Sequence, residues 1–201
     1  MAGLRERKKR ATRHAIHAGA MRLFAEQGFD GTTIDEIAEA ANVSRATVFS
    51  YFPTKEELVF GDTSSAIDSL AAALHAGAER DGTIGAFRAW LGELTGWIDP
   101  ELVLRQRLAR EVPGVAARRL AILAEIEQVI ADAFERELGP GRQLAARLSA
   151  ASMVAALRAT EESTAAAIEQ HGGVLSDSEI ATLLDDAVTF AQAGISALVR
   201  H

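Results

Sequence analysis

The stretch from Thr32 to Lys55 reads TTIDEIAEAANVSRATVFSYFPTK and decides the fold of the first part of the chain. Its first apolar residues recur at three- and four-residue spacing, which places them in one stripe along a short helix: Ile34, Ile37, Ala38 and Ala41. Asn42-Val43 interrupts this helix, and Ser44 stands where its hydroxyl can cap a second helix running toward Phe52. Two helices joined by so short a turn must cross steeply, so this pattern predicts a helix-turn-helix.

The second helix of this pair is expected to present one face to its surroundings. The residues on that face are Arg45, Ala46, Thr47, Ser50 and Tyr51. Directly after it, Thr54 is followed three residues later by Glu57, the spacing of a capping box, which predicts that another helix begins there.

The charge of the chain is unevenly distributed. Residues 1–55 hold 9 Lys and Arg against 6 Asp and Glu, and subtraction from the totals of 21 and 28 leaves 12 against 22 for residues 56–201. The first part is therefore net positive and the rest strongly negative, which favours a polyanionic partner confined to the first part. The basic run Arg5 to Arg13 alone would more simply be a solvated helix face.

Nearly the whole chain is expected to be helical, because Ala, Leu, Glu and Arg dominate and strand-like alternation is rare. The fold class is all-α, with about nine helices in two domains: residues 1–55 form the helix-turn-helix domain, and residues 56–201 a larger helical domain. The first helix runs from about Lys8 to Gln27 and ends at Gly28. A long fourth helix from Lys55 to about His75 is expected to link the domains.

The last two helices, about 142–170 and 176–199, are rich in small residues. The final one is apolar over more than a single stripe, so it needs a second packing partner. One solution is full burial inside one subunit. The preferred interpretation is a homodimer in which this helical hairpin pairs with its twin as a four-helix bundle.

Several function classes are excluded or disfavoured. The chain has no cysteine, so neither disulfides nor thiolate chemistry is expected, as suits a reducing cytoplasm. No apolar run reaches the length of a membrane span, and the basic N-terminus lacks the apolar segment of a signal peptide. No nucleophile, base and acid set and no phosphate-binding glycine loop stands out, so neither catalysis nor a cofactor is expected. His14 and His17 lack a third metal ligand and are expected to be solvated or near phosphate.

The motifs in residues 10–60 resemble those of the TetR (tetracycline-repressor-like) family of bacterial transcriptional regulators. The residues that carry the resemblance are Phe24-Ala25-Glu26-Gln27-Gly28-Phe29, Thr32-Thr33, Ile37-Ala38, Val43-Ser44 and Tyr51-Phe52-Pro53-Thr54-Lys55-Glu56-Glu57-Leu58. Beyond them the likeness is architectural only. The resemblance implies a homodimer whose recognition helices enter successive major grooves of a palindromic operator, and a second domain that binds a small-molecule effector.

The resemblance implies a role in DNA binding for individual residues of this sequence at the matching positions. Thr33, Tyr51 and Lys55 are then expected to contact phosphates. Ser44, Arg45 and Thr47 stand at the start of the recognition helix, with Arg45 as its one long cationic side chain.

Three positions depart from the family pattern. Asn42 stands where the turn usually has glycine, and Asn is among the least costly substitutes at positive φ. Phe49 replaces a commoner tyrosine and is expected in the core. Ser50 is small where relatives carry a longer polar side chain.

The effector site is expected where polar groups lie on apolar helix faces. Glu161 shares a face with Leu157 and Thr164, with Arg158 close by, and a buried carboxylate needs a partner. That partner is either a ligand or a cation such as Arg105 or Arg110. Trp90 and Trp97 line either the pocket or the core, with core preferred for at least one, and a mostly apolar lining would favour an apolar or amphipathic effector.

Two alternatives to a ligand-gated regulator stay open. One is a DNA-binding regulator with no small-molecule effector, controlled by its abundance or by a protein partner. The weaker one is an all-helical enzyme.

Overall fold

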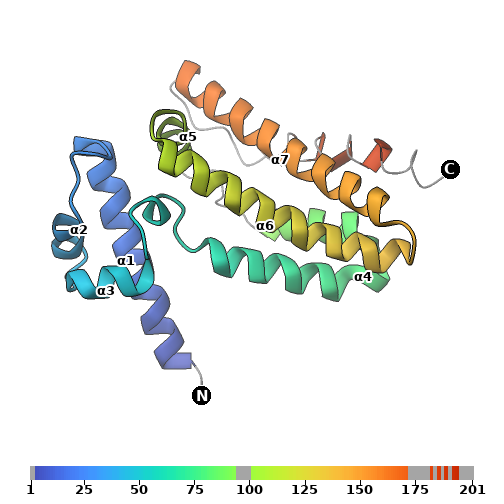
Figure 1. Ribbon diagram of the computed structural model, residues 1–201, viewed down its shortest axis with the longest axis horizontal. Coiled ribbons are helices and arrows are strands. Elements are labelled where there is room, and N and C mark those ends of the chain that lie inside the picture. Colours follow the sequence, from blue (N-terminus) through green and yellow to red (C-terminus); the bar gives the residue numbers. More distant parts are fainter. Residues whose placement is uncertain are drawn as a thin grey trace. The chain divides into compact units, whose positions relative to one another are not determined.

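The computed structural model describes residues 3–93 and 101–171, and beyond them only residues 182, 185–186, 188–189 and 192–194. Within that part of the chain every regular element is a helix, which confirms the all-α class (Figure 1). The elements are α1 (Gly3–Gln27), α2 (Ile34–Ala40), α3 (Arg45–Tyr51), the 3-10 helix η1 (Glu56–Val59), α4 (Thr63–Glu93), α5 (Glu101–Glu111), α6 (Pro113–Leu138) and α7 (Gln143–His171).

The chain divides into two compact units. Unit 1 contains the residues up to Thr63 together with Leu104–Leu120, and unit 2 contains Ser64–Val103 and the residues from Ala121 onward. Unit 1 therefore extends past the expected boundary at residue 55 and takes in the end of α5 and the start of α6. The helices α5 and α6 each contribute to both units.

Unit 1 is built around one buried cluster. In this unit α1 contacts α2 and η1, and α2 contacts α3 (Figure 1). Buried apolar side chains from all these elements meet in the cluster, and two of its members come from α5 and α6. The fully or almost fully buried ones include Ile16, Phe24, Ile37, Val48, Phe52, Leu58, Leu108 and Val115.

The turn between α2 and α3 has the conformation expected from the sequence. Asn42 has φ 53°, the left-handed conformation that Asn tolerates better than most residues. The Ser44 hydroxyl accepts the backbone N–H of Thr47 and so caps α3, as predicted. Gly28, at φ 80°, ends α1.

The predicted fourth helix is wrong at its start. The backbone leaves η1 at Gly61, with φ 61°, and α4 begins only at Thr63. No side-chain capping bond forms at the start of η1, so the capping box expected at Thr54 is absent. A single left-handed glycine thus splits what the apolar spacing suggested was one helix.

At the far end, the first part of α4 continues a few residues past His75. At Gly82 the backbone is non-helical, with φ 63° and ψ 178°, so α4 consists of two helices joined at a kink. Beyond the kink the Glu137 carboxylate, from α6, accepts the Thr83 N–H at 2.7 Å. This bond satisfies a donor that the kink would otherwise leave without a partner.

Unit 2 packs the long helices α4, α6 and α7 (Figure 1). Its core includes Phe87, Ile130, Phe134 and Met153. Arg88, on α4, pairs with Asp185 at 3.2 Å and donates to the Thr189 hydroxyl. The described C-terminal residues are thus attached to α4 by polar contacts.

Candidate nucleic-acid interface

Three of the five residues predicted for the free face of α3 are exposed, namely Arg45, Ala46 and Ser50, whereas Thr47 and Tyr51 are half-buried. Arg45, Ala46, Phe49 and Ser50 are all exposed, and their spacing of one, three and four residues puts them on one side of the helix. Val48 is fully buried and anchors the opposite side in the unit 1 cluster. The helix is therefore held by its inner side with its outer face available to a partner.

Phe49 is not a core residue, so that expectation was wrong. Its side chain is 40% exposed, and the Arg45 guanidinium lies 5.5 Å from the ring centroid. The four-residue spacing explains the outcome, because Phe49 shares its side of α3 with Arg45 and not with Val48. The spacing in the sequence was sufficient to place it.

Arg45 also forms an ion pair with α2. Its Nη1 lies 2.7 Å from Asp35 Oδ2, and both side chains remain more than half exposed. The guanidinium is thus bordered by a carboxylate and by an aromatic ring, and neither neighbour was predicted from the sequence.

The hydroxyls expected at the interface are engaged within the protein. Ser44 Oγ lies 2.8 Å from Thr47 Oγ1, and Ser50 donates its hydroxyl proton to the Thr47 carbonyl at 2.7 Å. Ser44 and Ser50 are exposed and Thr47 is half-buried. Ser50 and one member of the Ser44–Thr47 pair use their hydroxyl hydrogens in these bonds, so the three residues define the shape of α3 before they touch any partner.

Thr33 caps α2 in a capping box with Glu36, in which each residue accepts the backbone N–H of the other. The Thr33 hydroxyl accepts the Glu36 N–H at 3.2 Å, while the Glu36 carboxylate accepts the Thr33 N–H at 2.7 Å and its hydroxyl at 2.8 Å. These hydrogen bonds, the backbone one first, hold the pKa of Glu36 below its ordinary value of 4.5. This capping box was not predicted from the sequence, although its spacing would have been enough to identify it.

The lowered pKa of Glu36 predicts a pH-dependent contribution to stability. A lowered pKa means that the carboxylate stabilises α2 fully above pH 4.5, and that this stabilisation is lost as the pH falls through the folded-state pKa. Glu36→Gln keeps an acceptor but removes the charge, so it should lower the urea midpoint at neutral pH and not at pH values well below 4.5. Glu39→Gln, on the exposed side of the same helix, is the matched control and should show no such pH-dependent difference. An equal loss at both pH values would contradict the assignment.

Lys55 is half-buried and partly engaged. Its ammonium group donates to the Phe29 carbonyl, just after the end of α1, and lies 4.5 Å from the Phe29 ring centroid. Desolvation lowers the pKa of Lys55, against the opposing effect of nearby carboxylates. An ammonium has three donors, so this contact leaves others for a phosphate. Tyr51 is half-buried at the end of α3.

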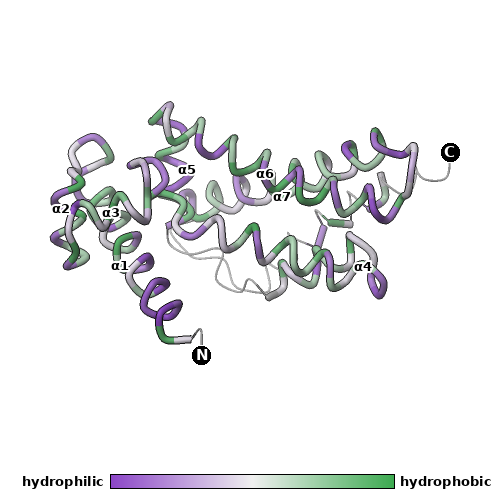
Figure 2. Tube along the Cα trace, turned by 60° about the horizontal axis from the view of Figure 1, so that its bottom comes forward, coloured by the Kyte–Doolittle hydropathy of each residue, from purple (hydrophilic) through white to green (hydrophobic). Residues whose placement is uncertain are grey.

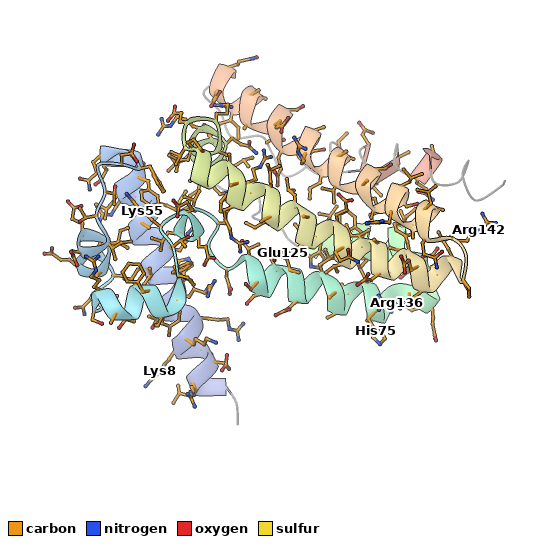
Figure 3. The ribbon with its side chains drawn as sticks, in the orientation of Figure 1. Lys8, Lys55, His75, Glu125, Arg136 and Arg142 are labelled. Carbon is orange, nitrogen blue, oxygen red and sulfur yellow. The ribbon has the colours of Figure 1, made fainter. Side chains whose placement is uncertain are left out.

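The N-terminal half of α1 is an exposed basic segment. Arg5, Arg7, Lys8, Lys9 and Arg10 are all exposed, and Figure 2 shows this part of α1 as strongly hydrophilic. Lys8 projects away from the helix (Figure 3).

Arg13 does not belong to this exposed segment, although the basic run suggested it. Its guanidinium pairs with Asp62 at 3.1 Å, donates to the Tyr51 and Gly61 carbonyls, and lies 4.6 Å from the Phe52 ring centroid. Arg13 therefore ties α1 to the end of α3 and to the segment before α4. His17 is also turned inward, with Nδ1 2.7 Å from the Leu58 carbonyl oxygen, and so differs from its expected solvated state.

Arg13→Ala and Arg10→Ala should separate the structural arginine from the exposed one. Loss of Arg13 leaves three acceptors on two segments without this donor, so we expect unit 1 to lose about 1 to 2 kcal/mol. Arg10→Ala should leave stability unchanged and, if Arg10 contacts phosphate, reduce the salt dependence of DNA binding by about one ion. Hydrogen exchange of α1–α3 amides and a salt titration of DNA binding measure the two effects. A stable Arg13→Ala protein would show that these contacts are dispensable.

The residues expected at an effector site lie in both units. Trp90, in unit 2, is 3% exposed, lies 5.9 Å from Phe87 between ring centroids, and donates its indole N–H to the Ser69 hydroxyl at 3.1 Å, which makes it a core residue. Glu161 is half-buried on α7, between the buried Leu157 and Thr164.

Arg158 and Arg105 are the other candidates that the structure describes. Arg158 is exposed and pairs with Glu162 one turn further along α7, at 3.7 Å. Arg105 is half-buried and belongs to unit 1. Trp97 lies outside the described residues.

The two helices predicted to form the dimer, about 142–170 and 176–199, are described only in part. The first coincides with α7, whereas most of 176–199 lies outside the described residues. On α7 Leu144 and Leu148, four residues apart, are exposed apolar side chains.

Among the residues that the structure covers, no cluster of His, Asp or Glu side chains is suited to a metal ion. No helix in that part is long and apolar enough to cross a membrane.

A pair of short helices joined by a left-handed turn, with a capped second helix exposed on its outer face, together with an exposed basic segment of α1, is typical of a helix-turn-helix DNA-binding protein. Residues 16–60 match the model of the bacterial regulatory proteins of the tetR family. The chain is 37% identical over 135 residues to the transcriptional regulator TcmR of Streptomyces glaucescens, covering 62% of this chain and 59% of TcmR. It is 30% identical over 136 residues to the putative mycofactocin biosynthesis regulator MftR of Mycobacterium tuberculosis, covering 66% of this chain and 69% of MftR. The protein belongs to the TetR family of transcriptional regulators.

Solved structures agree with this fold over most of the chain. A TetR-family regulator from Mesorhizobium loti aligns with a TM-score of 0.55 at 22% identity, covering 90% of this chain and 95% of its own. Thermus thermophilus FadR, a TetR-family repressor in complex with lauroyl-CoA, aligns with a TM-score of 0.54 at 24% identity, covering 90% and 93%.

Proposed function

We propose that this protein is a homodimeric repressor that binds a palindromic DNA operator and releases it when a small effector binds. The observation that carries the proposal is the outer face of α3, where Arg45 and Phe49 stand exposed on a helix whose inner side is anchored by the fully buried Val48. Membership of the family supports a regulatory function, and the proposed site of action is the cytoplasm.

The proposed DNA contacts fall into two groups. Arg45 is the base-reading residue, with Ser44, Thr47 and Ser50 shaping the helix surface around it. Thr33, Tyr51 and Lys55 are the proposed phosphate contacts, which position the protein without reading sequence. The exposed basic segment of α1 adds salt-dependent affinity.

The proposed effector is an apolar or amphipathic small molecule that binds in unit 2. The likeness in fold to a repressor in complex with lauroyl-CoA favours this class. Glu161 is the leading polar contact, because it is half-buried between fully and nearly fully buried neighbours on α7. Trp90, Trp97, Arg105 and Arg158 remain weaker candidates, since Trp90 packs in the core and Arg158 is exposed.

The route from effector to DNA is proposed to run through α5 and α6. Both helices belong partly to unit 2, yet Leu108 and Val115 are buried in the cluster that holds α1, α2 and α3. A ligand that shifts α5 or α6 in unit 2 would therefore act on the core that supports α3. It would weaken DNA binding only by its differential affinity for the two states.

Dimerisation is proposed to use the last two helices, about 142–170 and 176–199. The exposed Leu144 and Leu148 on α7 fit a surface that a second copy covers. Light scattering at low micromolar concentration should give twice the chain mass of 21.4 kDa, and a monomer would rule out this interface.

Salt titration of DNA binding tests the proposed regulator. The purified protein should bind DNA from upstream of its own gene with an affinity that falls steeply as salt rises, because cationic side chains release counterions from phosphates. Binding without salt dependence, or no binding, would contradict the proposal. Turnover of a substrate would favour the enzyme alternative instead.

A compound screen distinguishes a ligand-gated repressor from one without an effector. An effector binds the folded state, so it should raise Tm and also release DNA. Glu161→Ala should abolish both effects if Glu161 contacts the ligand. Glu162→Ala, its exposed neighbour, is the control. If no compound both raises Tm and releases DNA, the result would favour a regulator without a small-molecule effector.

A further inference from the structure

On the outer face of α3, the orientation of the Arg45 side chain is fixed by two contacts, one from α2 and one from α3. Its Nη1 bonds Asp35 Oδ2 at 2.7 Å, and its Cζ lies 5.5 Å from the Phe49 ring centroid. Asp35 comes from α2 and Phe49 from α3, so both helices of the pair contribute to holding the guanidinium. The neighbouring serine and threonine hydroxyls are engaged with one another and with backbone.

The ion pair between Arg45 and Asp35 is too exposed for a contribution to folding stability to explain its presence. The Arg45 side chain is 57% exposed and the Asp35 side chain 69% exposed, and pairs of this kind contribute little to folding because solvent screens them. A carboxylate on a DNA-facing surface also opposes binding to phosphates. The first turn of α2 accounts for a carboxylate at position 35, but not for its bond to Arg45, which calls for another role.

We propose that Asp35 is a specificity-determining positioning residue, which fixes Arg45 for reading a guanine in the major groove. This inference rests on the proposed DNA-binding function. A guanidinium has five N–H donors, so one bond to Asp35 leaves enough for a bidentate contact with guanine O6 and N7. Asp35 and the Phe49 ring restrict its rotation, so that Arg45 is kept from turning to a phosphate, where it would bind without selecting sequence.

Asp35→Asn supplies the test, carried out in the full-length protein. The probe is a duplex that the wild-type protein selects from a random pool, and the guanine read by Arg45 is located by replacing each guanine in turn with 7-deazaguanine, which lacks the N7 acceptor. In Asp35→Asn the preference for guanine over adenine at that position should fall about tenfold, part of the discrimination that a bidentate arginine provides. Affinity for unrelated duplex should rise, because a negative charge has been removed.

Glu39→Gln is the matched control, since it removes the same charge from an exposed position of the same helix. It should raise affinity for unrelated duplex and leave the guanine preference unchanged. In an Arg45→Ala background, Asp35→Asn should have no further effect on the preference. A merely structural role for Asp35 would lower Tm and affinity for all duplexes together.

Two outcomes overturn the inference and are distinct from failure of the proposed function. If Asp35→Asn raises affinity for selected and unrelated duplex equally, with guanine preference intact, Asp35 only masks Arg45. If the preference stays intact and no affinity changes, the ion pair has no role in recognition. If the wild-type protein selects no sequence at all, the proposed function itself fails.

Discussion

Leu108→Ala is expected to destabilise unit 1 by about 2 to 5 kcal/mol, although residue 108 is far in sequence from the helix-turn-helix. Leu108 is 2% exposed and belongs to the cluster formed by α1, α2, α3 and η1. Truncation removes buried methyl groups and leaves a cavity beside helices that support α3. Hydrogen exchange measured on peptides from residues 16–60 should show faster exchange, and DNA affinity should fall with it.

Leu120→Ala is the matched control for this prediction. It makes the same substitution in the same unit, but Leu120 is 60% exposed, so stability should change by no more than about 0.5 kcal/mol. Equal effects of the two substitutions, or exchange in residues 16–60 that does not respond to Leu108→Ala, would show that Leu104–Leu120 does not support the DNA-binding helices.

Arg45→Ala is expected to weaken binding to the selected operator by about 1 to 3 kcal/mol, roughly fivefold to 150-fold, because a bidentate contact to a base is lost. The exposed side chain contributes little to the core, so Tm should stay within a degree or two of the wild type. Titration of the labelled duplex by fluorescence anisotropy measures the loss.

Arg45→Lys separates charge from geometry. Lysine keeps the positive charge but lacks the planar fork, so it should retain affinity for unrelated duplex and still lose discrimination. Arg22→Ala, an exposed residue of α1 paired with Glu26 at 3.1 Å, should leave discrimination unchanged. Full specificity in Arg45→Lys would mean that Arg45 contacts phosphate and not a base.

The helix-turn-helix was predictable from the sequence because its determinants are local. Apolar spacing placed α2, Ser44 placed the start of α3, and Asn42 fitted the left-handed turn. Phe49 was misplaced although the same spacing puts it beside Arg45, since its bulk and apolar character suggested burial.

Other features depended on residues distant in sequence. The Thr83 N–H that follows the kink at Gly82 finds its acceptor in Glu137, from α6. No local pattern indicates that the α5–α6 segment completes the core of unit 1, because Leu108 and Val115 resemble any other apolar helix positions.

The candidate site was predictable as a set of residues and not as a set of interactions. The exposed face of α3 was expected, whereas the bonds from Arg13 to Asp62 and from Arg45 to Asp35 join residues whose distance only the tertiary structure defines. A basic run in the sequence does not reveal which of its arginines turns inward.

Selection from a random duplex pool tests most directly whether two copies of α3 read DNA. The account predicts enrichment of an inverted repeat whose half-site centres lie about one helical turn apart, roughly 34 to 36 Å, or a multiple of it. It also predicts that Arg45→Ala abolishes the enrichment while the protein stays folded. Absence of any enriched sequence, or the same repeat selected by wild type and Arg45→Ala, would contradict it.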